Sequence, residues 1–199
     1  MLLPALLLLA AEGPPLFYWG SRSAAIETGA AAGQSEQAVV QDVHAARQQA
    51  VLMLRFSFDR TVRKAMYAPG GAPVSGRLRA VLYVDRDGDR ATGPSAPEKD
   101  LRGGCELRLE LGVLALGADA EEQREATAVV TATLYELEAA GRRRRLWQAD
   151  DAAQPGDVSA HGEWAELRVP WELVRAGPAA RLVLAEGERL WEGRLALDP

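Results

Sequence analysis

The sequence predicts an all-β protein, a jelly-roll-like sandwich of two antiparallel sheets with one short helical turn. Apolar and polar residues alternate in about eight segments, and the short connections between them contain glycine, proline or aspartate. Each predicted strand has one apolar face, so a second sheet must cover that face. A chain of 199 residues is long enough to bury such a core.

The first predicted hairpin joins VVQDVHAAR, residues 39–47, to AVLMLRFSFD, residues 50–59, through a polar turn at Gln48 and Gln49. The apolar side chains of its second strand share one face, on which we expect Leu52, Leu54, Phe56 and Phe58. Arg55 and Ser57 point the other way because successive side chains of a strand alternate between its faces.

Three predicted strands in the middle of the chain follow the same rule. In GRLRAVLYVD, residues 76–85, the core face consists of Leu78, Ala80, Leu82 and Val84. In CELRLELGV, residues 105–113, it consists of Cys105, Leu107, Leu109 and Leu111. The third segment, ATAVVTATLYEL at 126–137, is rich in β-branched residues, which favour strands.

The C-terminal third contains three more predicted strands, WAELRVP at 164–170, ARLVLAEG at 180–187 and RLWEGRLAL at 189–197. Between the first two, PWELV at 170–174 predicts the short helical turn, since proline is favoured at the first position of a helix. Pro170 also ends the preceding strand, because proline lacks the backbone N–H that a central strand donates.

The N-terminus, MLLPALLLLAAEGPP, is wholly apolar from Leu2 to Ala11. A run of about 10 residues is too short to span a bilayer, which takes roughly 20, but it suits the core of a signal peptide. No Lys or Arg precedes this run, so an apolar arm packed on the domain is the alternative interpretation.

Three regions follow from these patterns: a signal peptide at 1–13, a linker or N-terminal arm at 14–37, and the β-sandwich domain at 38–199. Gly, Ala, Ser and Pro are frequent in the arm, which Tyr18 and Trp19 can pin to the domain surface. The signal peptide implies a secreted or periplasmic protein, and we expect no transmembrane span.

The formal net charge of −5, with both signs interspersed, argues against a nucleic-acid-binding protein, which is usually basic with clustered Lys and Arg. The same balance removes long-range attraction to anionic membranes. One basic cluster is present, Arg142–Arg145, after Gly141 and between two predicted strands. It is most simply a solvated hairpin tip, and a contact with an acidic glycan or a lipid headgroup is the alternative.

The stretch VLYVDRDGDRATG, residues 81–93, runs from an apolar strand into Asp85, Asp87 and Asp89. Aspartates at alternate positions can direct oxygens toward one centre, as in calcium loops with ligands at positions 1, 3 and 5. Gly88 permits the tight backbone turn that such a loop needs. We therefore interpret the three aspartates as a candidate calcium (Ca2+) site.

This site needs further ligands, for which the candidates are Glu98, Asp100, Glu106 and backbone carbonyls. An EF-hand is not predicted, because strands flank the loop and Arg90 stands where that motif requires glycine. The alternative is a solvated turn in which Asp85 caps backbone N–H groups, while Arg86 and Arg90 offset the repulsion between carboxylates.

Four motifs occur in a recognisable order: VLYVDRDGDRATG at 81–93, GGCELRLEL at 103–111, RRRRLWQAD at 142–150 and AELRVPWELV at 165–174. This order resembles the β-sandwiches related to family-9 carbohydrate-binding modules and DOMON domains, over roughly residues 38–197. Two features depart from the family pattern. Its Gly-Ala-Asp-Tyr becomes Gly104-Cys105-Glu106-Leu107, and the arginine run has no counterpart.

The resemblance implies a module that binds sugars without cleaving them, and sugars stack on aromatic rings. Trp164 lies on the polar face of its predicted strand with Glu166 and Arg168, and this group is the first candidate sugar platform. Trp147 is the second candidate. The alternatives are that Trp164 covers the sheet edge or packs under the arm and that Trp147 belongs to the core or an interface.

Some DOMON relatives hold a b-type haem through Met, His or Lys side chains. The residues of these types that we considered as ligands are His44, His161, Met53, Met66 and Lys64. We expect ordinary surface histidines here and no haem.

We expect no enzymatic activity, because the chain lacks Gly-x-Ser-x-Gly, His-Glu-x-x-His and a phosphate-binding glycine loop. Acidic residues are plentiful, so a carboxylate pair for glycoside hydrolysis is the alternative, but the sequence singles out no such pair. The predicted function is an exported non-catalytic binding or accessory module, with carbohydrate as its ligand and calcium as a structural ion. Its expected partner is a polysaccharide or a cell-envelope component. The alternative function is a structural cell-envelope interaction domain without a small-molecule ligand.

Overall fold

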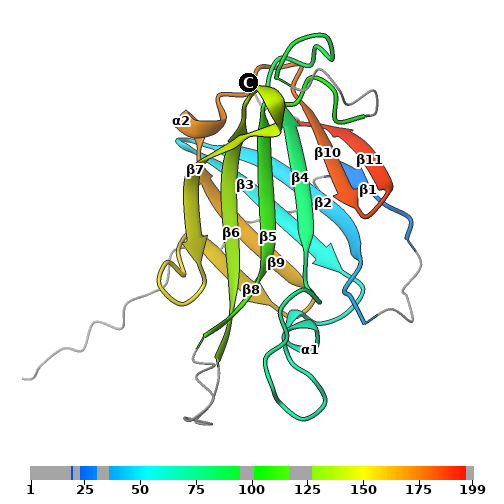
Figure 1. The fold of residues 1–199 in the computed structure, drawn as a ribbon, viewed down its shortest axis with the longest axis vertical. Coiled ribbons are helices and arrows are strands. Elements are labelled where there is room, and N and C mark those ends of the chain that lie inside the picture. Colours follow the sequence, from blue (N-terminus) through cyan, green and yellow to red (C-terminus); the bar gives the residue numbers. More distant parts are fainter. Residues whose placement is uncertain (1–18, 20–22, 31–35, 95–100, 117–126, 196–199) are drawn as a thin grey trace, which may run out of the picture.

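Two antiparallel sheets make up most of the described chain (Figure 1). The structure is a computed structural model, and it describes residues 19, 23–30, 36–94, 101–116 and 127–195. The predicted all-β sandwich of two sheets is confirmed. The predicted signal peptide at 1–13 and Tyr18 lie outside the described residues.

The first sheet has five strands in the order β1–β2–β3–β9–β8. They are β1 (Ile26–Glu27), β2 (Val40–Gln48), β3 (Val51–Phe58), β9 (Trp164–Pro170) and β8 (Val158–His161). The predicted turn at the end of β2 is present, and Gln49 adopts a positive φ of 51° there. β1 belongs to the predicted linker or arm and pairs with β2, so the arm extends this sheet by a short strand.

The second sheet has six strands in the order β11–β10–β4–β5–β6–β7. They are β11 (Arg189–Arg194), β10 (Arg181–Glu186), β4 (Ala80–Asp85), β5 (Leu107–Leu116), β6 (Thr127–Leu137) and β7 (Arg143–Asp150). Both sides of β4 are paired, with β5 on one side and β10 on the other.

The main core lies between the sheets and contains the predicted inward residues of β3, with Leu52, Leu54 and Phe56 each 1% exposed. A second, smaller cluster lies on the outer face of the six-stranded sheet and consists of Val81, Tyr83, Cys105 and Val183. The prediction that Cys105 shares a face with Leu107 is therefore wrong. β5 begins only at Leu107, and the turn at Gly104, with φ of 85°, breaks the alternation before it.

Two short helices lie outside the sheets (Figure 1). The predicted turn after Pro170 is α2 (Trp171–Val174). The other helix, α1 (Val62–Met66), was not predicted; in it the Thr61 side chain accepts a hydrogen bond from the Lys64 N–H. Five residues are too few to show a helical period, so only this cap marks α1.

The arginine run lies mostly in a strand and not at a hairpin tip. The turn before it is formed by Ala139–Gly141, in which Ala140 and Gly141 have φ values of 62° and 73°. Arg143, Arg144 and Arg145 belong to β7. Among the described residues, no helix has the length and apolar character needed to cross a membrane.

Glu186, the last residue of β10, links the two sheets by accepting a hydrogen bond of 2.8 Å from the Val40 N–H. Burial raises the pKa of the Glu186 carboxyl above its ordinary value of 4.5. The Val40 N–H lowers this pKa, and the charge of Asp59 raises it further. The net upward shift means that the folded state binds the Glu186 proton more tightly than the unfolded chain does.

We therefore predict that Glu186 destabilises the fold progressively as the pH rises through and above about 4.5, because the folded state resists ionisation there. The free energy of unfolding of the wild type, relative to that of Glu186→Gln, should decrease over this pH range and then level off. Urea unfolding of both proteins at a series of pH values measures this difference. A free energy of unfolding of the wild type that increases relative to that of Glu186→Gln as the pH rises would contradict the prediction.

Candidate binding sites

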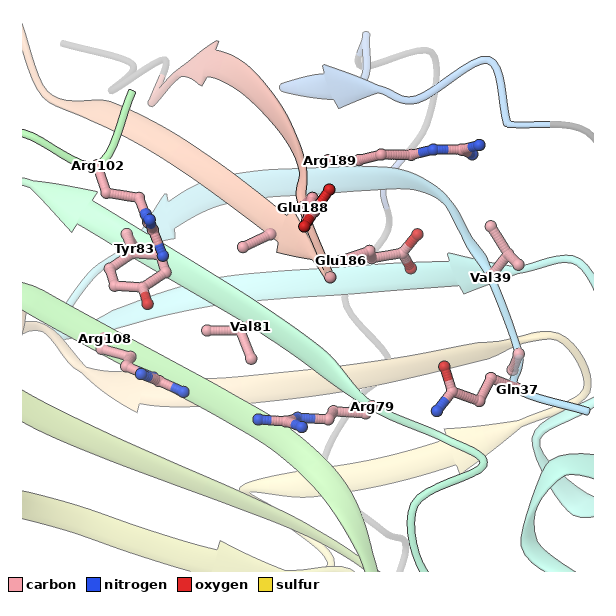
Figure 2. A pocket seen from close by; sticks show the side chains of 13 residues that line it. Gln37, Val39, Arg79, Val81, Tyr83, Arg102, Arg108, Glu186, Glu188 and Arg189 are labelled. Atoms are coloured by element: carbon pink, nitrogen blue, oxygen red, sulfur yellow. The ribbon is translucent and has the colours of Figure 1, made fainter. Parts of the chain in front are cut away.

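A polar groove lies over the outer face of β4, with a volume of about 750 Å³ (Figure 2). Its floor is formed by Val81 and Tyr83, which belong to the smaller apolar cluster. One wall is the turn between β10 and β11, and another is the chain at 37–39 that leads into β2. The groove arises because alternation along β4 places apolar side chains on this outer face as well as in the main core.

Four arginines and two glutamates are among the residues that line this groove, and they are Arg79, Arg102, Arg108, Arg189, Glu186 and Glu188. The guanidinium carbons of Arg102 and Arg108 lie 5.9 and 5.5 Å from the centre of the Tyr83 ring. These cation–π contacts restrict both side chains. Figure 2 shows Arg79 and Arg108 extending toward each other over the floor.

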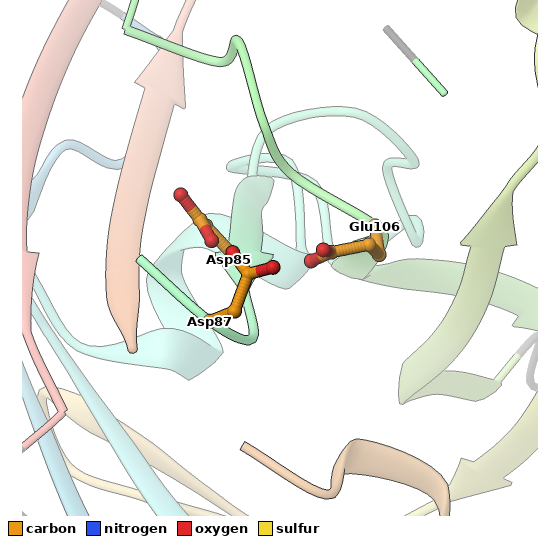
Figure 3. A group of neighbouring side chains, drawn as sticks. All are labelled: Asp85, Asp87 and Glu106. Carbon is orange, nitrogen blue, oxygen red and sulfur yellow. The ribbon is translucent and has the colours of Figure 1, made fainter. Parts of the chain in front are cut away.

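A second candidate site is an acidic cluster at the end of β4, formed by Asp85, Asp87 and Glu106 (Figure 3). Each of the three offers a carboxylate oxygen within 4.8 Å of the others. Asp85 is buried and Asp87 is exposed. Glu106, the residue directly before β5, extends its side chain toward them. The arrangement can hold a metal ion, because hard cations are bound by clustered carboxylate oxygens.

Backbone hydrogen bonds shape the loop around the acidic cluster. Asp85 accepts from the Gly88 N–H at 2.7 Å, and Asp87 accepts from the Asp89 N–H at 2.8 Å. Glu106 accepts from the Arg86 N–H at 2.8 Å. The predicted capping role of Asp85 is thus present, and it leaves room for a metal contact since each carboxylate oxygen has two acceptor positions.

Two glycines hold the acidic loop against its neighbours. Gly88 has a φ of 76°, and a Cβ there would lie 2.3 Å from the Ala179 carbonyl oxygen. Gly104 has a φ of 85°, and a Cβ there would lie 2.6 Å from the Asp89 carbonyl oxygen. Both positions therefore require glycine, for their conformation and for the close approach of another backbone segment.

Asp85 is fully buried and forms an ion pair with Arg181, the first residue of β10. Its Oδ2 lies 2.8 Å from Arg181 Nε and 2.6 Å from Nη2. The same guanidinium donates to the carbonyl oxygens of Leu101 and Gly103. Arg181 was not among the predicted site residues, although an arginine directly before the apolar run LVLA is a sequence signal of a buried charge.

The electrostatics of the cluster differ from one carboxyl to the next. Burial raises the pKa of Glu106, the Arg86 N–H lowers it, and the charges of Asp85 and Asp87 raise it again. Hydrogen bonds from the Asp89 N–H and from Thr92 lower the pKa of Asp87. A bound cation would relieve the repulsion at Glu106, while the positive charge of Arg181 nearby opposes cation binding.

The structure brings together two of the three predicted calcium ligands and one of the predicted additional ligands. Asp89 lies outside the acidic cluster, and its side chain accepts a hydrogen bond from the Ala91 N–H. Glu106 takes its place within the cluster. Glu98 and Asp100 lie outside the described residues.

Three of the four predicted sugar contacts share the outer face of β9. Trp164, Glu166 and Arg168 lie opposite Ser57, Arg55 and Met53 of β3. The Arg55 guanidinium carbon stands 5.0 Å from the centre of the Trp164 ring. Glu166 is only 7% exposed and accepts a hydrogen bond from the Trp19 indole.

Trp19 thus pins the arm to the domain, as predicted, and covers part of this outer face. It packs on Ala46 and Met53, and its ring lies 5.7 Å from that of His44. Trp147, the fourth predicted sugar contact, lies on β7 in the other sheet and packs against the main core. The structure therefore does not bring Trp147 together with Trp164.

The residues considered as haem ligands are distributed over three places. His44 and Met53 lie beneath Trp19, and Met66 and Lys64 lie on α1. His161 ends β8, with its ring 5.6 Å from that of Trp164.

Glutamates on β5, on β6 and directly after β6 balance the charge of Arg142, Arg143 and Arg144. Arg143 Nη1 lies 2.7 Å from Glu110 Oε1, and Arg144 pairs with Glu136. Arg142 Nε is 3.8 Å from Glu138 Oε2. These pairs reduce the capacity of the run to act as an isolated anion-binding patch.

Comparison with protein-family models, with curated proteins and with solved structures gave no match to this chain.

We predict that Asp85→Ala lowers the free energy of unfolding by about 3–5 kcal/mol, because it leaves the Arg181 charge buried and unpaired. The double variant Asp85→Leu/Arg181→Met should be much closer to wild type, since it removes both charges. Asp89→Ala, in the same loop but exposed, is the control and should change stability by about 0.5 kcal/mol or less. Urea unfolding measures all three, and a double variant as unstable as Asp85→Ala would refute this account.

Proposed function

We propose that the protein is an exported, non-catalytic binding module, with a carbohydrate ligand in the groove and a structural calcium ion in the acidic cluster. The groove is the observation that carries the proposal. Its volume of about 750 Å³ is within the range of roughly 300–1,000 Å³ typical of small-molecule sites. Arginine donors and glutamate acceptors line it, and such groups form hydrogen bonds with sugar hydroxyls.

The position of the carboxylates supports a binding role rather than glycoside cleavage. Glycosidases place two carboxyl groups on either side of the bond that is cleaved. Here Asp85 is fully buried and engaged by Arg181, so no sugar ring can reach it. Glu186 at the groove is tied to the Val40 N–H.

The oxygen-rich acidic cluster supports calcium as the ion. Calcium accepts six to eight oxygen ligands in irregular geometry, so three carboxylates together with water or backbone carbonyls are a suitable set. The opposing charge of Arg181 favours weak binding, with a Kd on the order of 10⁻⁴–10⁻³ M, as in extracellular modules. A millimolar concentration would then stabilise the fold by roughly 0.4–1.4 kcal/mol.

We predict that millimolar calcium raises the melting temperature by about 1–5 °C and that a chelator reverses this rise. Asp87→Ala should abolish the shift, because Asp87 is the exposed ligand of the cluster and is not part of the buried ion pair. Asp89→Ala is the matched control, since it removes a carboxylate two residues away and leaves the cluster intact. Equal melting temperatures of the wild type with calcium and with chelator would contradict the calcium site.

For the carbohydrate role, we predict that the purified protein binds at least one saccharide class on a glycan array and in titration calorimetry, without turning it over. Product analysis after long incubation with the bound saccharide tests for turnover. Release of shorter sugars, lost when one carboxylate is replaced, would contradict the non-catalytic role. An array without any binding would contradict the carbohydrate role itself, and a stable complex with an envelope protein would then favour the structural alternative.

A further inference from the structure

The charges that line the groove indicate which class of saccharide it takes. On the basis of the proposed carbohydrate binding, we propose that the groove selects an acidic oligosaccharide, one that carries carboxylates on successive sugars, as uronate oligomers do. The carboxylates contact the arginines at one end of the groove, and the hydroxyls contact the glutamates at the β10–β11 turn.

The arginine end of the groove is built to receive an anion. The Tyr83 ring restricts Arg102 and Arg108, so less side-chain entropy is lost when their N–H groups bind a ligand. Arg79 is exposed and extends toward Arg108 (Figure 2). Arg108 Nε lies 2.8 Å from Glu110 Oε1, and this pair balances part of its charge. A ligand carboxylate beside Arg79 and Arg108 gains attraction from both guanidinium groups. The planar guanidinium also matches the two oxygens of a carboxylate.

The opposite end of the groove restricts the ligand to one with spaced charges. Glu186 and Glu188 stand there beside Arg189 (Figure 2). Their carboxylates accept hydrogen bonds from hydroxyl groups, but they repel a densely charged polyanion such as a nucleic acid. The net charge of −5 adds to that repulsion. A uronate oligomer offers hydroxyls to the glutamates on each sugar, and the carboxylate of the sugar at this end can pair with Arg189.

The strand pairing argues against a peptide that adds a strand. Such a peptide needs a free backbone edge to bind, but β4 beneath the groove is paired with β5 and with β10. Recognition in this groove must therefore use side chains, and the charged groups described above are side chains that line it.

Titration calorimetry with trigalacturonate as probe, and with its full methyl ester as the uncharged counterpart, tests the inference. We expect the wild type to bind the acid at least tenfold more tightly than the ester, with an affinity that falls as salt is added. Arg79→Ala and Arg108→Gln should each weaken binding of the acid about tenfold, the loss expected when a charge-assisted hydrogen bond is removed. Arg79 is exposed, so its replacement leaves the fold intact.

Arg63→Ala is the matched control, because it removes an exposed positive charge on α1, outside the groove. Equal weakening by Arg63→Ala and Arg79→Ala would overturn the inference in favour of general charge attraction. Binding of the acid that Trp164→Ala abolishes and Arg79→Ala leaves unchanged would place the site on the other sheet. Binding of neutral sugars alone would overturn the acidic class while the carbohydrate function stands, and no binding of any saccharide would remove both.

Discussion

The buried ion pair between Asp85 and Arg181 is the interaction on which both candidate sites depend. It joins the end of β4 to the start of β10, where the two residues are partners in the ladder. Arg181 also binds the carbonyls of Leu101 and Gly103, so it fixes the chain that leads into β5. Arg102 of the groove and Glu106 of the acidic cluster both lie on that short stretch. A single guanidinium therefore positions a cationic and an anionic site.

The two sites also share one strand. Arg79, directly before β4, and Val81, Tyr83 and Asp85 within it occupy alternate positions, from the groove to the acidic cluster. Alternation places all four on the outer side of the six-stranded sheet, while the intervening residues fill the main core. A strand buried on both faces is rigid, and rigid elements keep binding groups in fixed positions. A ligand at either site therefore contacts side chains that the strand already holds in position.

The outer faces of the two sheets differ in what covers them. On the five-stranded sheet, Trp19 from the arm packs on Met53 and donates a hydrogen bond to Glu166. Glu166, a predicted sugar contact, is therefore engaged in holding the arm to the sheet. Arg55 stands over the ring of Trp164 on the same face. On the six-stranded sheet, the corresponding surface forms the groove. The groove thus lies on the six-stranded sheet and not on the sheet whose outer face carries Trp164.

The local features of this protein follow from its sequence alone. The period of two in Leu52, Leu54 and Phe56 identifies β3 and its buried face, and Pro170 locates α2, because burial and chain direction repeat over a few residues. The turn at Gly88 follows from glycine and aspartate chemistry in the same way. The alternation rule failed at Cys105, where one turn with a positive φ resets which face a side chain takes.

Which distant residues come into contact depends on the tertiary fold. Arg181 is 96 positions from Asp85, and Glu106 replaces Asp89 in the acidic cluster because β5 pairs with β4 in one register. The groove likewise combines the chain before β2, two adjacent strands and the β10–β11 turn. Periodicity records whether a side chain is buried, but the register between strands far apart in sequence sets its neighbours, and that register depends on the packing of the whole sandwich.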